Sequence, residues 1–84
     1  MNAENLPALR LASLLLGQSG ILKYTANHDL HLALLNLGVK QGAKLTIANI
    51  APLGDPIAVA VNGTKIAIRK ADAKHIIVEP IQEA

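Results

Sequence analysis

The side chains best suited to chemistry are two histidines that lie three residues apart. His28 and His31 flank Asp29 in a segment whose pattern predicts a helix, so the two imidazoles can point the same way. Imidazoles are common ligands of zinc and related metals, but a stable site needs a further ligand, and His75 is distant in the sequence. We interpret His28 and His31 as weak metal candidates, completed at most by a second copy of the chain, and we expect no cofactor.

The rest of the chain offers little that could support catalysis. It has three histidines, six carboxylates and no cysteine, and no nucleophile or phosphate-loop signature appears. We therefore expect a protein that is not an enzyme. The lack of cysteine also excludes disulfides and thiolate metal ligands, and it favours a reducing, cytoplasmic location.

The distribution of charge does not indicate a nucleic-acid-binding surface. The formal net charge is +2, and apart from Arg69 and Lys70 the basic residues occur singly. Small barrels can bind single strands through stacking aromatics, but Tyr24 is the only aromatic residue in the chain. A small nucleic-acid-binding barrel therefore stays an alternative, and we expect no nucleic-acid partner.

The five residues "PLGDP" from Pro52 to Pro56 form an unusual break between two apolar runs. The prolines stiffen both ends, and Leu53 and Gly54 can occupy the centre of a tight turn in which Gly54 takes a positive φ. Asp55 can accept hydrogen bonds from backbone amides of the loop. A rigid hairpin loop explains all of these residues except Leu53, an apolar side chain at an exposed tip, so a contact with a partner stays open beside it.

The helix that carries the histidines is the clearest regular element. Asn27 can cap its first turn, Asp29 suits the positive end of the helix dipole, and Gly38 can end it in a left-handed conformation. One stripe of four apolar residues should face the core: Leu30, Ala33, Leu34 and Leu37. Leu32 and Leu35 fall on another side, which we expect to be partly exposed.

Beyond this helix the apolar residues alternate with a period of two, which predicts strands. They cover residues 44–47, 57–61, 65–69 and, after a helical turn over 70–74, 75–80; Asn62 and Gly63 predict a type I′ hairpin. Before the helix we favour a turn around 17–20 and a strand over 21–25, with a helix that starts near Pro7 as the alternative. The predicted fold is a small, mainly β antiparallel barrel over 11–80, with a flexible N-terminus over 1–10 and a tail over 81–84.

Four motifs in this order resemble the FeoA family, small cytosolic proteins associated with ferrous iron uptake. They are Leu11, Leu14 and Gly17; Leu37, Gly38 and Gly42; Pro52, Leu53, Gly54, Asp55 and Pro56; and Arg69, Lys70, Asp72 and Ala73. The resemblance covers most of the chain and implies a Src-homology-3-like barrel with one inserted helix. One departure is the helix segment of His31, Leu32 and Ala33, where the family often has basic residues.

The resemblance also implies a function. It suggests a non-enzymatic adaptor that binds the cytosolic side of the FeoB ferrous iron permease, through the permease's GTP-binding domain, and reaches the membrane only through that partner. The predicted contact residues are Leu53, Gly54, Asp55, Leu32 and Leu35. Two alternatives stay open beside the nucleic-acid-binding barrel: a ligand- or metal-sensing barrel related to the C-terminal domain of iron-dependent repressors, and self-association into a homo-oligomer.

Overall fold

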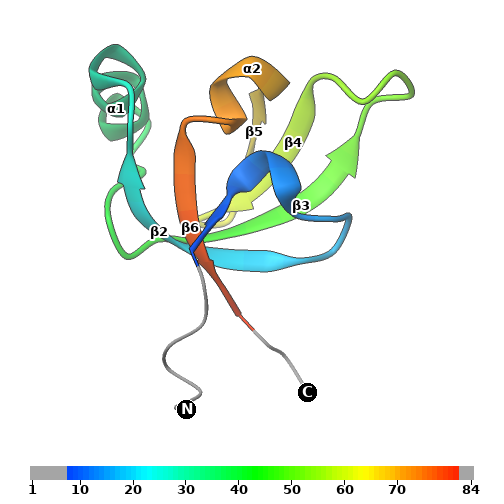
Figure 1. The fold of residues 1–84 in the computed structure, drawn as a ribbon, viewed down its shortest axis with the longest axis horizontal. Coiled ribbons are helices and arrows are strands. Elements are labelled where there is room, and N and C mark those ends of the chain that lie inside the picture. Colours follow the sequence, from blue (N-terminus) through cyan, green and yellow to red (C-terminus); the bar gives the residue numbers. More distant parts are fainter. Residues whose placement is uncertain (1–7, 82–84) are drawn as a thin grey trace.

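Six antiparallel strands form one sheet in the computed structural model, which describes residues 8–81 (Figure 1). In chain order the elements are β1 (Leu9–Arg10), the 3-10 helix η2 (Leu11–Ser13), β2 (Ser19–Thr25), α1 (His28–Asn36), β3 (Lys44–Ile50), β4 (Ile57–Val61), β5 (Thr64–Ile68), α2 (Lys70–Ala73) and β6 (Ile76–Pro80). The order across the sheet is β1-β6-β2-β3-β4-β5. The mainly β fold with one longer helix agrees with the prediction.

The N-terminal boundary of the fold differs from the predicted one. Most of the flexible terminus and tail that we predicted lies outside the described residues, but Leu9 and Arg10 pair with Val78 and Ile77 of β6. They join the sheet because β6 would otherwise leave the backbone groups of one edge without partners.

The alternating pattern produces the core as predicted. In β3 and β4 the apolar residues of one face are buried, while their neighbours are half-buried or exposed. The largest fully buried side chains come from three strands, η2 and the segment after α1: Leu11, Val39, Leu45, Ile47, Val59, Ile76 and Val78. Tyr24 is largely exposed, so this core is built without an aromatic side chain.

The strand β2 lies in the middle of the sheet, between β6 and β3. It pairs with β3 on one side and with β6 on the other, and its register shifts between Leu22 and Tyr24, which marks a β-bulge. At its start the buried Ser19 hydroxyl hydrogen-bonds the Thr46 hydroxyl of β3 at 2.7 Å. The next residue is Gly20, where an added Cβ would lie 2.8 Å from Cγ2 of Val78 in β6.

The two edges of the sheet are not hydrogen-bonded to each other in the described part of the chain, so the barrel is open between β1 and β5. Each edge strand is followed directly by a short helical segment, η2 after β1 and α2 after β5. These two segments contact each other, and each contains a fully buried apolar residue, Leu11 or Ala73. The core is therefore covered by helical turns where the strands do not meet.

Two turns predicted from local sequence are confirmed. Asn62 and Gly63 have φ values of +53° and +78°, as a type I′ turn between β4 and β5 requires. The favoured turn and strand before α1 are also present, although β2 begins at Ser19, two residues earlier than predicted, and a short 3-10 helix over Leu11–Ser13 precedes the turn.

The helix α1 begins as predicted but buries less of its surface. The Asn27 side chain accepts a hydrogen bond from the Leu30 N–H at 3.0 Å. Of the stripe predicted to face the core, Leu34 is buried and Leu30 is half-buried, whereas Ala33 and Leu37 are exposed. The prediction is wrong for those two residues because α1 lies at one end of the molecule (Figure 1), packs mainly against β2 and ends before Leu37. No helix among residues 8–81 is both long and apolar enough to cross a membrane.

We expect a Gly20→Ala substitution to lower the free energy of unfolding by about 1–3 kcal/mol, because the new methyl group would overlap Val78. Urea denaturation measures the loss. In a Val78→Ala background the substitution should still be destabilising, because Cβ of Val78, 2.9 Å from the added Cβ, remains. A Gly20→Ala variant as stable as the wild type would contradict the close approach of β2 and β6.

Candidate functional site

The loop between β3 and β4 is held by its own backbone. The Gly54 N–H donates to the Ala51 C=O at 2.7 Å, and the Ala51 N–H donates to the Pro56 C=O at 3.1 Å. Pro52 and Leu53 therefore occupy the two central positions of the turn, and Gly54 follows with a φ of +87°. The prediction that placed Leu53 and Gly54 at the centre is wrong by one position, because the fixed φ of proline suits the first central position.

Asp55 connects this loop to a distant part of the chain. Its Oδ1 accepts a hydrogen bond at 2.9 Å from the N–H of Lys70, the first residue of α2. We predicted that Asp55 accepts hydrogen bonds from amides of its own loop. That prediction is wrong, because the donor is the N–H of Lys70 in α2. Arg69, at the N-cap of α2, makes no side-chain capping bond, so Asp55 supplies the acceptor that the helix lacks locally.

Leu53 lies at the tip of the anchored loop with 96% of its surface exposed. Neighbouring Gly54 is half-buried and Asp55 is exposed. An apolar side chain presented to water on an ordered loop is typical of a contact site. The roles of Leu53, Gly54 and Asp55 in binding a partner remain predictions.

The second predicted contact region is the outer side of α1. Leu32 and Leu35 are 46% and 42% exposed, and Leu37 just beyond the helix is exposed as well. Figure 1 shows α1 and the loop between β3 and β4 at opposite ends of the molecule. The five predicted contact residues therefore form two separate regions rather than one surface.

Sequence reasoning missed two further exposed leucines, Leu15 and Leu16, in the turn before β2. The signal available was the run of three leucines from Leu14 to Leu16. A turn cannot direct three successive side chains into one core, and only Leu14 of the three is buried.

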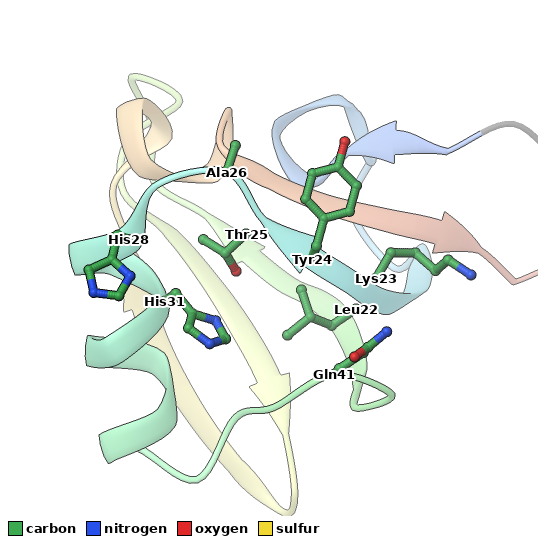
Figure 2. Close-up of a pocket in the computed structure, with 8 residues that line it drawn as sticks. All are labelled: Leu22, Lys23, Tyr24, Thr25, Ala26, His28, His31 and Gln41. Atoms are coloured by element: carbon green, nitrogen blue, oxygen red, sulfur yellow. The ribbon is translucent and has the colours of Figure 1, made fainter.

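A hollow of about 290 Å³ lies between α1 and β2 (Figure 2). It is lined by Leu22, Lys23, Tyr24, Thr25, Ala26, His28, His31 and Gln41. Figure 2 shows both imidazoles on α1, with His31 the nearer to Leu22. The Thr25 hydroxyl oxygen is buried and has no hydrogen-bond partner among the described residues. A hollow of this size can hold water that satisfies such a group.

The histidines do not complete a metal site in the described part of the chain. The His75 C=O accepts a hydrogen bond from the Ala26 N–H at 2.7 Å, so the fold brings the His75 backbone near the start of α1. Even so, no group of three histidine, cysteine, aspartate or glutamate side chains among residues 8–81 is arranged to bind a metal ion. The arrangement does not fit a structural or catalytic metal that needs three protein ligands.

Sequence comparison identifies a known domain over nearly the whole described region. A family model described as the FeoA domain matches residues 9–80. The FeoA protein of Chlorobium tepidum, solved by NMR, is 33% identical with a TM-score of 0.82, and the match covers 88% of this chain and 71% of that one. The family resemblance inferred from the four motifs is confirmed.

Two other solved structures bear on the fold. The FeoA protein of Stenotrophomonas maltophilia, a complex with zinc described as a prokaryotic SH3 domain protein, is 26% identical with a TM-score of 0.73, over 90% of this chain and 99% of that one. The predicted Src-homology-3-like fold is confirmed. A manganese-dependent transcriptional repressor matches with a TM-score of 0.79 at 18% identity, over 92% of this chain and 44% of the repressor. That likeness is one of fold alone.

We expect Asp55→Ala to lower the free energy of unfolding by about 1 kcal/mol, because the Lys70 N–H at the start of α2 loses its acceptor. Asp55→Asn retains a side-chain oxygen and should lose less. Urea denaturation gives the free energies, and amide hydrogen exchange at Lys70 reports the bond directly. Unchanged exchange at Lys70 in Asp55→Ala would contradict the bond.

The donor can be removed separately by Lys70→Pro. Proline is favoured at the first position of a helix, and Arg69, with a ψ of 145°, has the extended conformation that tolerates a following proline. We expect Lys70→Pro to lower the free energy of unfolding by as much as Asp55→Ala does. In the Asp55→Ala background it should lower it little further, because both substitutions remove the same bond. Lys70→Ala, which keeps the N–H, is the matched control, and additive costs would count against the bond.

Proposed function

Because this chain belongs to the FeoA family, we propose that it is a non-enzymatic accessory protein of ferrous iron uptake that binds the cytosolic side of a FeoB-type permease. The family itself supports a role in ferrous iron transport. The proposal adds the partner, its GTP-binding domain and a cytoplasmic location for this chain.

The observation that carries the proposal is the exposure of Leu53 on an anchored loop. The loop is closed by two backbone hydrogen bonds and fastened to α2 through Asp55, so little conformational freedom remains to be lost on binding. Leu53 itself has nearly all of its surface available to a partner. Burying such a side chain fully contributes on the order of 2 kcal/mol to association.

An accessory protein of this kind acts by preferring one state of its partner. A bound protein shifts a conformational equilibrium only by the difference between its affinities for the two states. The GTP-binding domain offers two such states, with GDP or with GTP bound. We propose that the loop contacts a surface of this domain that differs between them.

The outer side of α1 is the second candidate contact. Leu32 and Leu35 are less exposed than Leu53, and α1 lies at the opposite end of the molecule from the loop (Figure 1). A partner that engages one of these regions need not reach the other. We place the loop first because it combines the larger exposure with the tighter anchoring.

We expect saturable binding to the cytosolic part of the permease, measured by calorimetry, with affinities that differ between GDP and a non-hydrolysable GTP analogue. Leu53→Asp should weaken the preferred complex by about tenfold or more, because it places a charge in an apolar contact. Its thermal unfolding midpoint should stay close to that of the wild type, because the side chain is exposed.

Two further variants locate the contact. Leu35→Asp tests α1, and Thr64→Asp adds the same charge at an exposed position of the hairpin between β4 and β5. Loss of binding in Leu35→Asp with full binding in Leu53→Asp would move the contact to α1. An equal loss of binding and of thermal stability in Leu53→Asp would show that Leu53 supports the fold instead.

A further inference from the structure

Two exposed basic residues lie next to the leucine loop although they are distant from it in sequence. The bond between Asp55 and the Lys70 N–H places the first residue of α2 against the loop. The Cα atoms of Leu53 and Asp55 are at most about 7 Å apart, because two residues span no more than that. Arg69 and Lys70 are both exposed, so two cationic side chains project from the segment that Asp55 fastens to the loop of Leu53.

These two cations have no ion pair within the described part of the chain. Lys23 and Glu79 form an ion pair between β2 and β6. Asp55 in the loop and Asp72 in the first turn of α2 are acidic groups close to these cations, and both lie at the N-terminal end of α2. There, backbone N–H groups offset negative charge, and the Asp55 carboxylate already accepts one of them.

From this arrangement we propose that Leu53, Arg69 and Lys70 form one docking surface for a protein partner that offers an apolar pocket bordered by carboxylates. Leu53 supplies the apolar anchor, and the two cations pair with acidic groups at the rim. Asp55 is a positioning residue: it keeps the cations beside Leu53 without contacting the partner. The inference rests on the proposed function and adds the chemistry of the partner's surface.

The complementarity of charge selects this partner among the possible ones. A second copy of the same surface would bring Arg69 and Lys70 of both copies together, and like charges at an interface are unfavourable. An apolar side chain flanked by unpaired cations is instead matched by an acidic rim around an apolar pocket.

The test removes the positive charges of Arg69 and Lys70 by substitutions that keep the fold. We expect Arg69→Gln combined with Lys70→Gln to weaken binding to the cytosolic part of the permease by about tenfold at low salt, mainly through a slower association rate. The wild-type affinity should fall as salt is raised, and the double variant should be much less sensitive to salt. The double variant keeps the Lys70 N–H, so the bond to Asp55 remains.

A matched control removes the same net charge elsewhere. Lys40 and Lys65 lie near the hairpin of Asn62 and Gly63, at the other end of β4 from the loop, and both are exposed. Lys40→Gln combined with Lys65→Gln should change the affinity by less than about twofold, as expected for charges outside the contact.

Asp55 gives a second readout that distinguishes positioning from contact. Asp55→Ala should weaken binding, and Asp55→Asn should largely restore it. Lys70→Ala removes only the charge of Lys70, whereas Lys70→Pro also removes the N–H that donates to Asp55, so Lys70→Pro should bind more weakly than Lys70→Ala. Equal binding by Lys70→Pro and Lys70→Ala would overturn the positioning role.

The outcomes separate this inference from the proposed function. Wild-type binding that both pairs of substitutions weaken equally would leave the proposed function standing and overturn the docking surface. The wild-type chain could instead associate tightly with itself, and the double substitution of Arg69 and Lys70 could strengthen that association. This result would also overturn the docking surface, in favour of a homo-oligomer contact. Failure of the wild-type protein to bind the permease in either nucleotide state would overturn both proposals together.

Discussion

The rest of the structure depends on the pairing of β2 with both β6 and β3. This strand joins the C-terminal strand of the fold to the meander of β3, β4 and β5, so a single sheet includes segments from both ends of the described chain. The close approach at Gly20, where β6 leaves no room for a Cβ, brings the backbones together. The bulge beyond it bends the strand toward α1. Without β2 the two halves of the sheet would expose their apolar faces.

The core built on this sheet contains aliphatic side chains and no aromatic ones. Such a core gains its stability from many small contacts, and a single truncation removes a larger share of it than in a larger domain. The helical turns η2 and α2 complete it where the edge strands do not meet. One of these turns has another consequence, because the Lys70 N–H of α2 donates a hydrogen bond to Asp55 and thereby fixes the loop of Leu53.

This connection links fold and proposed function through a single bond. A four-residue helix whose own N-cap residue makes no side-chain capping bond takes its acceptor from a loop 15 residues earlier in the chain. The helix gains a cap, and the loop gains an anchor. In the proposed complex the same bond determines which charged side chains stand beside the apolar tip.

Local patterns in the sequence determined the elements and many of their ends. The alternation in β3, β4 and β5, the Asn62–Gly63 turn and the Asn27 cap all depend on a few neighbouring residues, and each appears in the structure as predicted. The order of four short motifs was enough to predict the family.

Only the tertiary structure decided which side chains meet. It exposed Leu37 and Ala33, which helical periodicity had directed to the core, because the position of α1 relative to the sheet is not encoded in the helix itself. It brought the His75 backbone to the start of α1, joined Asp55 to Lys70, and separated Leu53 from Leu32 and Leu35. Periodicity and turn chemistry act over a few residues, whereas these contacts depend on how strands distant in sequence pair and bend.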